Sequence, residues 1–374
     1  MLLKAIASPV VTGLRPSPLH DRHVALGAKL AEFGGWEMPI SYRGVVEEHT
    51  AVRTAVGVFD VSHLGNVVVR GPRAKDFVNS CFTNDLDRIG PGQAQYTLCC
   101  DDENGGVVDD LIVYYTSDTE LHLVPNAANA AEVVRRLQAV APHDIEIVDE
   151  HTDFAILAVQ GPKSPDVLTA VGIEAAMDYM AFDVVKWHGV QVTVCRTGYT
   201  GERGYELVVP AGDAAKLWDA LLEAMSSYDG LPCGLGARDT LRTEMGYPLH
   251  GQDLSLEITP VQARAGWAVG WDKPVFWGRD VLVHERGEGP RRSLWGLRAT
   301  DRGIPRPHMS VLDADGHHLG QVTSGTFSPS LKLGIGLALL EHHAQAGDQV
   351  TIDVRGRTSA AEVVKPPFVP SHVR

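Results

Sequence analysis

The chain has 374 residues, of which 44% are hydrophobic and 21% are charged, an ordinary composition for a globular protein of two or three domains. A formal net charge of −14 argues against nucleic-acid binding, because a phosphate backbone attracts a basic surface. No apolar run approaches the roughly 20 residues of a membrane span, so no membrane partner is expected. The short apolar stretch at the N-terminus lacks a small-residue cleavage site, which predicts a loose extension of about 16 residues and no signal peptide.

The five cysteines are odd in number and contain no C-x-x-C pair, which argues against a disulfide framework and against a zinc ribbon. A reducing, cytoplasmic location is the simplest interpretation. The pairs His317-His318 and His342-His343 do not have the i, i+4 spacing of a helical metal site, so we expect no metal. Two G-x-G segments, "GLGARD" and "GIGLAL", lack the third glycine of a dinucleotide fingerprint and are predicted to be turns or packing glycines.

In chain order, residues 24–33 have the amphipathic spacing of a helix that ends at Gly34-Gly35. Residues 57–71 then alternate as one or two strands would. The elements expected next are a helix at 73–82, antiparallel strands at 95–100, 105–115 and 120–124, a helix at 127–140, a strand at 153–161, two strands joined by a glycine-rich turn within 190–210, and helices at 214–225 and 236–246. Strands mixed with helices in antiparallel runs predict an α+β fold and not a doubly wound parallel sheet.

The composition changes near residues 285–292. Beyond this point, short alternating segments are separated by glycine and aspartate turns, a pattern typical of a small β-barrel or jelly roll. The sequence therefore predicts two parts, an α+β region at residues 1–284 and a barrel domain at residues 285–374.

Two adjacent aspartates, Asp109 and Asp110, interrupt the apolar strand predicted at 105–115. Side chains alternate along a strand, so the two must point to opposite faces and one of them must point to the buried side. A buried carboxylate without a partner is strongly unfavourable. The pair therefore raises the question of what a carboxylate does on the buried side of this strand.

Two further segments combine polar residues with glycine. "RTGYTGERGYEL" (196–207) places Tyr199 in a turn and Glu206 in the returning strand, and "GLGARDTLRTEMG" (234–246) places Arg238 at the start of a helix. Asn126 lies across the predicted hairpin from the aspartate pair. Taken one at a time, each is more simply explained as a turn residue, a surface carboxylate or a helix-dipole pair.

The same segments, taken together with "FGGWEMP", "EEHTAVRTAVGVFDVSH", "GGVVDDLIVYY", "AVQGP", "TSGTFSPSL" and "KPPFVP", resemble in order the T-protein family of the glycine cleavage system, especially its actinobacterial members. The resemblance covers roughly residues 17–370. It implies two interleaved folate-binding α+β domains and a C-terminal β-barrel, arranged around a central cavity.

The activity that the resemblance implies is tetrahydrofolate-dependent aminomethyl transfer in glycine catabolism. The one-carbon unit would pass from S-aminomethyl-dihydrolipoyl H-protein to tetrahydrofolate, giving 5,10-methylenetetrahydrofolate, ammonia and dihydrolipoyl H-protein. Folate and lipoylated H-protein are then the expected partners, with tetrahydrofolate as a co-substrate and no metal.

The resemblance also implies roles for single residues. Asp110 matches the carboxylate that lies near the folate amines, and Asp109 is then expected to be outward or structural. Glu206 would accept the two N–H groups at the edge of the pterin ring. The other folate-binding candidates carried over from the family pattern are Arg238, Tyr199, Asn126, Tyr96, Leu64 and Trp267. For Trp267 a place in the core is an equal alternative.

Two internal positions depart from the family pattern, and the C-terminus lacks a tyrosine that some relatives have, so no ligand role is carried to Val373. Leu64 stands where many relatives have methionine and should keep an apolar wall intact, because the exchange conserves volume. His250 stands where many relatives have tyrosine and is expected to add a polar contact or a pH dependence. Arginines also gather at the start of the barrel domain and form either a solvated face or a docking patch for H-protein; they are Arg291, Arg292, Arg298, Arg302 and Arg306.

Two alternative functions come from relatives with the same fold. One is a folate-dependent demethylase, against which the intact "GYTGE" and "SGTFSP" segments argue. The other is a non-catalytic folate-binding protein of iron–sulfur maintenance. Such proteins typically carry a reactive cysteine where this chain has the tyrosine of "RTGYTGERGYE".

Overall fold

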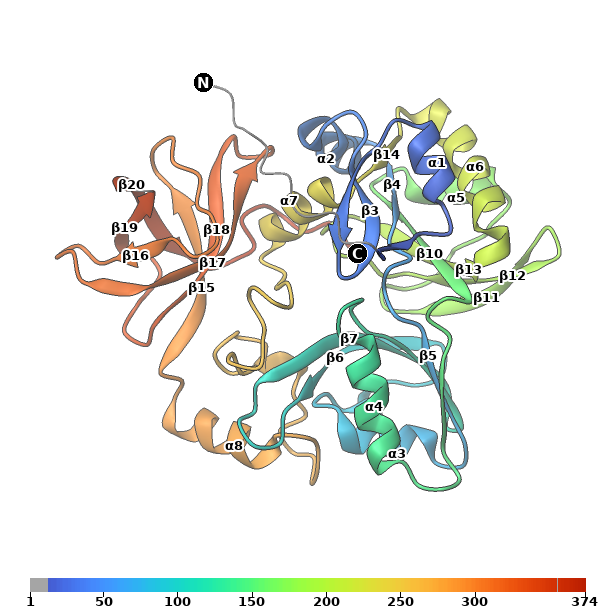
Figure 1. Ribbon diagram of the computed structural model, residues 1–374, viewed down its shortest axis with the longest axis horizontal. Coiled ribbons are helices and arrows are strands. Elements are labelled where there is room, and N and C mark those ends of the chain that lie inside the picture. Colours follow the sequence, from blue (N-terminus) through green and yellow to red (C-terminus); the bar gives the residue numbers. More distant parts are fainter. Residues whose placement is uncertain (1–12, 355) are drawn as a thin grey trace.

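The computed structural model describes residues 13–354 and 356–374 of the chain. Two α+β units and a barrel surround the centre of the molecule (Figure 1). The strands form a three-stranded, a five-stranded and a six-stranded sheet, and a closed six-stranded barrel. The prediction of an α+β fold with a C-terminal barrel is therefore confirmed. None of the described helices is long and apolar enough to cross a membrane.

The first α+β unit is built on the six-stranded sheet, with strand order β11-β12-β13-β10-β4-β14. Its strands are β4 (Gly57–Asp60), β10 (Phe154–Gln160), β11 (Phe182–Trp187), β12 (Val190–Cys195), β13 (Gly204–Pro210) and β14 (Leu231–Cys233), and its helices are α2 (Val45–Thr54), α5 (Ser164–Ala170), α6 (Ala214–Met225) and α7 (Leu235–Met245). Strand β10 is almost entirely buried, because β13 and β4 pair with its two edges and helices cover it. Strands β11 and β14 were not predicted.

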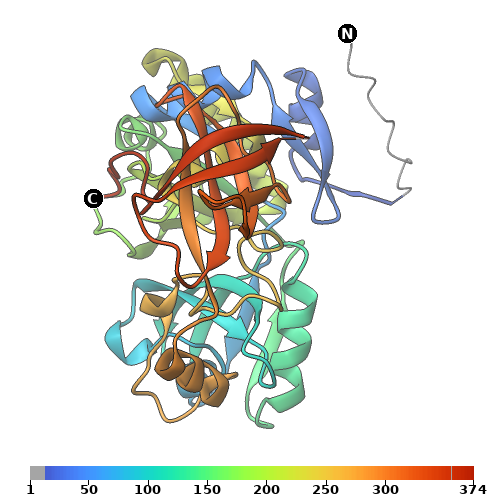
Figure 2. The same cartoon turned by 90° about the vertical axis from the view of Figure 1, so that its left-hand side faces the viewer.

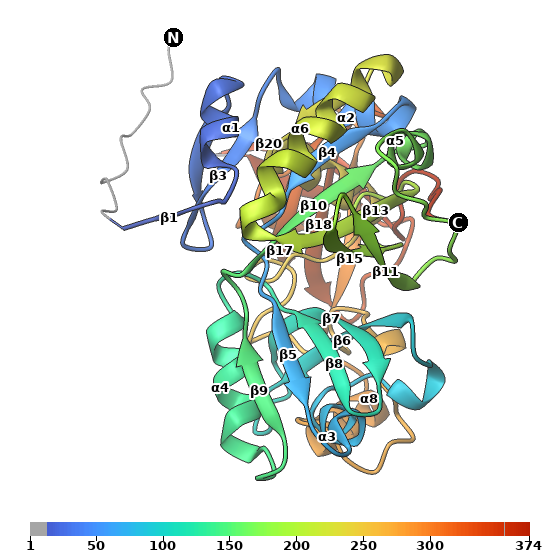
Figure 3. The same ribbon diagram turned by 90° about the vertical axis from the view of Figure 1, so that its right-hand side faces the viewer.

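The second α+β unit is a five-stranded sheet of order β6-β7-β8-β5-β9, with α3 and α4 packed beside it (Figure 3). Its elements are β5 (Val67–Arg70), α3 (Ala74–Cys81), the 3-10 turn η1 (Leu86–Arg88), β6 (Gln93–Cys100), β7 (Val107–Ser117), β8 (Glu120–Val124), α4 (Ala130–Val140) and β9 (Glu146–Asp149). The chain leaves the six-stranded sheet after β4, completes this sheet and returns at β10. The two units are thus interleaved, as predicted.

The helix predicted at residues 24–33 is wrong. Helix α1 (His20–Ala25) ends before Gly27, and residues 29–33 form strand β2 (Lys29–Phe33), which pairs with β3 (Trp36–Ser41). Gly34 and Gly35 form the turn with φ values of 59° and 86°, the two positive values that a tight hairpin turn requires. Beside them, strand β1 (Arg15–Pro16) pairs parallel with β3, so the last residues of the predicted loose extension are ordered; residues 1–12 lie outside the described part.

The barrel has the strand order β15-β18-β17-β16-β19-β20 and faces the viewer in Figure 2. Its strands are β15 (Arg292–Ala299), β16 (Ser310–Leu312), β17 (His318–Ser328), β18 (Leu333–Glu341), β19 (Gln349–Val354) and β20 (Arg357–Val364). The "GIGLAL" glycines lie within β18, where a Cβ on Gly334 would meet the Gly303 carbonyl oxygen at 2.3 Å, so they are packing glycines. Helix α8 (Arg279–Glu288) crosses residue 285, and we therefore propose a domain boundary at residues 289–291 in place of 284/285.

Helix α7 connects the barrel to the first α+β unit and is buried along most of its length. At its N-terminal end, the buried Glu48 carboxylate accepts hydrogen bonds from the backbone N–H groups of Gly234 and of residues 42–44. At its other end, Glu244 accepts hydrogen bonds from Arg53 of α2 and Ser328 of the barrel. Because these buried carboxylates are fully paired, they fix the position of α7 and of the residues it carries.

The segment between α7 and α8 lies against the hairpin of β6 and β7. Gly106, at the start of β7, approaches the backbone of Leu256 so closely that a Cβ would lie 1.9 Å from the Leu256 carbonyl oxygen. The backbone N–H of Val107 also donates to the carbonyl oxygen of Ser255. These contacts hold the loop that contains His250 beside the strand that contains Asp109 and Asp110.

We predict that Gly106→Ala lowers the free energy of unfolding by about 1–3 kcal/mol or more, because the added methyl group must displace backbone atoms. Gly212→Ala is the matched control, since a Cβ there meets nothing within 4 Å, and it should change the free energy by less than about 0.5 kcal/mol. Urea unfolding of both variants measures the difference. Equal stabilities would show that the loop yields without cost.

Candidate functional site

The aspartate pair lies on β7, the second strand of the five-stranded sheet. Leu98 pairs with Asp110 and Cys99 with Asp109, and a register shift follows, so that Cys100 pairs with Val107. Asp109 has no exposed surface, whereas Asp110 is half-buried. The expectation that Asp109 is outward is therefore wrong, and its structural alternative fits, because the loop after β8 provides the partners that a buried carboxylate needs.

Asn126 and Asn129 supply those partners. The backbone N–H of Asn126 donates to Asp109 Oδ2 at 3.0 Å, and its Nδ2 lies 2.9 Å from both Asp109 Oδ1 and Asp110 Oδ1. The Nδ2 of Asn129 donates to Asp109 Oδ1 at 2.7 Å. Every neighbour of Asp109 in these contacts is a donor, and a single amide contacts both carboxyl groups. Sequence reasoning found Asn126 but missed Asn129, although both lie in the same short loop.

Burial raises the pKa of both carboxyl groups. The pKa of Asp109 rises to about 8 through burial and then the charge of Asp110, against the opposing hydrogen bonds of the asparagines. Burial also raises the pKa of Asp110, against the opposing effects of His250, Tyr96 and Asn126. Two coupled carboxyl groups of this kind titrate as a pair, so at neutral pH the pair holds a proton.

His250 extends this network through both ring nitrogens. Asn129 Nδ2 donates to His250 Nδ1 at 3.0 Å, so the Nε2–H group donates to the Val107 carbonyl oxygen, also at 3.0 Å. Nδ1 is therefore the accepting nitrogen, and Nε2 carries a hydrogen in this arrangement. The expected polar contact of His250 is present, and it joins the loop after α7 to the aspartate pair.

An aromatic pair lies beside the second carboxylate oxygen of Asp110. The Tyr96 hydroxyl group donates to Asp110 Oδ2 at 3.1 Å, and its ring stacks on Trp267 with the ring centroids 5.2 Å apart. Trp267 is 67% exposed, so the alternative of a core tryptophan is wrong. An exposed indole stacked on a tyrosine leaves apolar surface for a ligand beside the carboxylate.

A second group of predicted residues comes from the other sheet and from α7. The guanidinium carbon of Arg238 lies 4.5 Å from the ring centroid of Tyr199, whose hydroxyl group donates to the Pro248 carbonyl oxygen and whose ring stacks on Tyr247. Burial lowers the pKa of Arg238, while the charge of Glu206 opposes that shift. Within residues 13–354 and 356–374, the Arg238 guanidinium makes no hydrogen bond or ion pair with another residue. Its donors are therefore free for a ligand.

The predicted residues thus form two groups of contacting side chains. Asp110, Asn126, Tyr96 and Trp267 are in direct contact, as are Tyr199 and Arg238. Burial and then the charge of Asp110 raise the pKa of Tyr96. The loop at residues 248–250 links the two groups, since the Tyr199 hydroxyl group donates to the Pro248 carbonyl oxygen and His250 contacts Asn129. Glu206 accepts a hydrogen bond from Thr197 at 2.5 Å, and half-buried Leu64 packs against the core under β4 and β10. Tyr247 and Thr197, which contact these residues, were not predicted as site residues.

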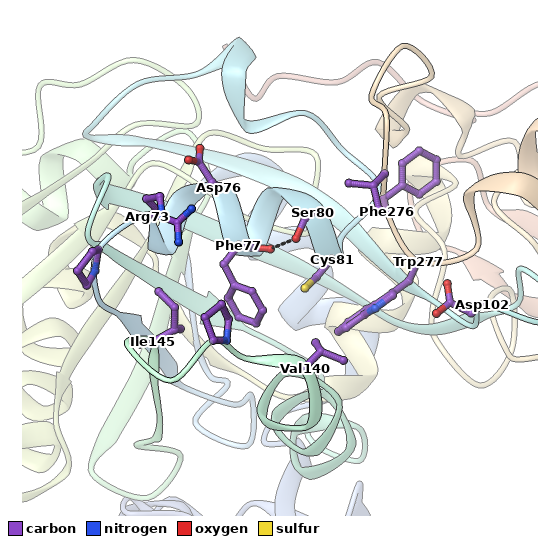
Figure 4. A pocket seen from close by; sticks show the side chains of 13 residues that line it. Arg73, Asp76, Phe77, Ser80, Cys81, Asp102, Val140, Ile145, Phe276 and Trp277 are labelled. Atoms are coloured by element: carbon purple, nitrogen blue, oxygen red, sulfur yellow. Dashed lines mark hydrogen bonds between the residues drawn. The ribbon is translucent and has the colours of Figure 1, made fainter.

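Two cavities lie outside this constellation. One, of about 560 Å³, is lined by α3 and by residues 275–277, with Phe77, Cys81 and Trp277 around it (Figure 4). The other, of about 330 Å³, lies between the loop at residues 251–258 and the barrel. Neither is lined by a predicted site residue, so the central folate cavity remains a prediction.

Comparison with known proteins identifies close relatives over nearly the whole length. Residues 19–273 match the family described as GCVT N-terminal domain, and residues 292–370 match the Glycine cleavage T-protein C-terminal barrel domain. The aminomethyltransferase of Parafrankia sp. (strain EAN1pec) is 66% identical, over 96% of this chain and 99% of that protein. The aminomethyltransferase of Mycobacterium tuberculosis (strain ATCC 25618 / H37Rv) is 61% identical, over 94% of this chain and 96% of that protein.

The same similarity extends to three dimensions. The crystal structure of glycine cleavage system aminomethyltransferase T from Bartonella henselae superposes with a TM-score of 0.90 at 32% sequence identity. The match covers 96% of this chain and 99% of that structure.

The raised pKa of the aspartate pair predicts a pH-dependent stability. The unfolded chain releases the Asp109 proton near pH 3.8, whereas the folded chain keeps it to about pH 8, so folding takes up a proton between these values. The stabilisation is complete below pH 3.8 and is lost as the pH rises through about 8. The free energy of unfolding should therefore fall from pH 5 to pH 8, by at most about 1.4 kcal/mol per pH unit for one proton.

Asp109→Asn should flatten this dependence, because an amide does not titrate. Urea unfolding of both proteins at pH 5, 6, 7 and 8 measures the two slopes. Parallel slopes would show that Asp109 is ionised in the folded protein throughout this range.

Proposed function

The chain belongs to the glycine cleavage T-protein family and is an aminomethyltransferase of the glycine cleavage system, and from this premise we propose that it transfers the aminomethyl carbon of lipoylated H-protein to tetrahydrofolate at the Asp110 site. The observation that carries the proposal is the half-buried Asp110 carboxyl group, held by donors and bordered by an exposed aromatic wall. A cytoplasmic location, suited to the five free and buried thiols, is part of the same proposal.

The donor and acceptor set suits a folate. A pterin ring presents two adjacent N–H groups, which a carboxylate accepts at two points, and Glu206 has one oxygen engaged by Thr197 while Oε1 has no hydrogen-bond donor among the described residues. Arg238 offers unpaired donors for the ring carbonyl group or for a folate carboxylate. Tyr96 and Trp267 offer aromatic faces to the flat part of the molecule. Asn126 donates to the Asp110 carboxylate and Tyr199 lies against the Arg238 guanidinium, and both are proposed folate contacts together with Leu64.

The overall reaction defines what Asp110 has to do. The aminomethyl group loses its amine as ammonium, its carbon forms two bonds to folate nitrogens, and the dihydrolipoyl sulfur regains a proton. The two folate N–H protons balance the reaction, one going to the ammonia and one to the sulfur. A carboxyl group beside these nitrogens can orient them, stabilise positive charge that develops there and move one proton. The raised pKa of Asp110 brings its proton affinity closer to neutral pH.

We predict that Asp110→Asn lowers turnover by about 100-fold or more, the usual scale for loss of a proton-transferring group, while folate binding persists. The assay combines purified protein, aminomethylated lipoyl H-protein and tetrahydrofolate, and follows methylenetetrahydrofolate and ammonia. Glu206→Gln is the comparison variant and should weaken folate binding instead. Folate binding without turnover in the wild type would move the protein to the demethylase or non-catalytic class.

The arginine cluster on the barrel is proposed to contact H-protein. Arg298 pairs with Glu362, and Arg292 bonds Gln262 and the Glu257 carbonyl oxygen, so these two charges are already engaged within the chain. Arg306 is also exposed, but its side chain donates to the Gly325 carbonyl oxygen. Arg291 and Arg302 are exposed and have no salt bridge or side-chain hydrogen bond to another described residue. They are therefore the two charges best placed to attract an acidic partner.

Reversing Arg291 and Arg302 to glutamate should weaken apparent H-protein affinity and reduce its salt dependence, because exposed charges act mainly through long-range attraction. Arg135→Glu on α4, an exposed arginine outside the cluster, serves as the control. Apparent affinities are measured from turnover at several salt concentrations. Unchanged affinity at every salt concentration would remove the docking hypothesis and leave a solvated face.

A further inference from the structure

We propose that Tyr114 and Thr197 form a hydrogen-bond relay that positions Glu206 and so sets how strongly the enzyme recognises the 2-amino edge of the folate pterin ring. The inference rests on the proposed folate-dependent function and deepens it. Both residues act through Glu206 and are therefore positioning residues.

The direction of the relay follows from the groups themselves. Thr197 Oγ1 lies 2.5 Å from Glu206 Oε2 and 3.1 Å from the Tyr114 hydroxyl oxygen. A carboxylate can only accept, so the single threonine proton goes to Glu206, and Thr197 must accept from Tyr114. The relay therefore runs one way, from the tyrosine through the threonine to the carboxylate.

The relay holds one oxygen atom of Glu206 and leaves the other without a hydrogen-bond donor. Tyr114 and Thr197 are 5% and 3% exposed, whereas Glu206 is half-buried. No donor among the described residues reaches Glu206 Oε1, and Oε2 keeps a lone pair beyond the one that Thr197 uses. Both oxygens are thus available to the two adjacent N–H groups of a pterin edge.

An apolar layer surrounds the relay. Tyr114 lies in a buried cluster with Ala94 and Cys195, and the ring of Phe182 meets it edge-on with the centroids 5.3 Å apart. Burial raises the pKa of Tyr114 far above its usual value, so its hydroxyl group remains a donor at every physiological pH. Hydrogen bonds in such surroundings are stronger than in water, and an unmade one is costly, so the relay holds one arrangement.

The relay also crosses between the two α+β units. Tyr114 lies on β7 four residues after Asp110 and therefore on the same face of the strand, while Thr197 and Glu206 belong to the six-stranded sheet and its connecting loop. Backbone hydrogen bonds from Ala94 to Met180 and from Phe182 to Gly92 join the sheets beside it. Strand β7 thus carries Asp110, which is proposed to act in the chemistry, and also Tyr114, which orients Glu206 through Thr197.

The competing explanation is that the two hydroxyl groups only satisfy each other in a buried interface. A structural role of that kind would change stability but would not change the choice between two ligands that differ at the pterin edge. The test therefore measures discrimination between tetrahydrofolate and an analogue in which a methyl group replaces the 2-amino group.

Thr197→Val keeps the shape and removes the relay. We expect the KM for tetrahydrofolate to rise by about 10-fold or more, kcat to stay within about 3-fold, and discrimination against the analogue to fall by a similar factor, as for a lost hydrogen bond to a charged group. Thr197→Ser should restore wild-type values. Tyr114→Phe removes one hydroxyl group only and should give a smaller loss in the same direction.

Thr200→Val is the matched control, because Thr200 is also buried in this loop but donates to Gln160. It should keep full discrimination. The proposal is overturned if Thr197→Val and Tyr114→Phe both discriminate as the wild type does, or if Thr200→Val loses discrimination equally. Failure of the folate-dependent function would look different, since the wild type itself would then neither bind tetrahydrofolate nor discriminate.

Discussion

The structure depends on how two adjacent carboxyl groups are accommodated inside a sheet. Strand β7 pairs with β6 at Asp109 and Asp110 and with β8 from Ile112 onward, so the backbone that carries the two carboxyl groups is fixed within the sheet. The loop after β8 turns the backbone and side chain of Asn126 and the side chain of Asn129 toward them. These donors replace only part of the hydration that the carboxylates lose on burial. The ionised form is therefore disfavoured, and the pair keeps a proton near neutral pH.

The interleaved chain path brings the other functional groups to this pair. Because the chain builds the five-stranded sheet between β4 and β10, two connections tie that sheet to the six-stranded one. Helix α7 then carries Arg238 into the same region, fixed by the buried carboxylates of Glu48 and Glu244. The candidate site is thus assembled from two sheets and one helix, none of which contains all the proposed ligand-binding residues.

Local patterns predicted most strands and the pairing of β6, β7 and β8, since alternation and turn chemistry act over a few residues. The same patterns failed at residues 24–33, where the spacing suits a helix but the double-glycine turn and pairing with β3 favour a strand. Asp110 stood out because a carboxylate conflicts with an apolar strand. Thr197 and Asn129 gave no such signal, since their partners lie far away in sequence or in an ordinary turn. Trp267 gave no sequence signal that separates it from a core tryptophan, and only its 67% exposure in the structure places it outside the core.

The most direct test of this account is isotope-edited infrared spectroscopy of the folded protein with ¹³C-labelled aspartate. Exposed aspartates are ionised at pH 7, so a carbonyl band of a protonated carboxyl group reports a buried one. The account predicts such a band at pH 7, its loss as the pH rises past about 8, and an altered band in Asp110→Asn and in Asp109→Asn. A spectrum with only carboxylate bands at pH 7 would contradict it, because both aspartates would then be ionised and Asp110 would have no partner with which to share a proton.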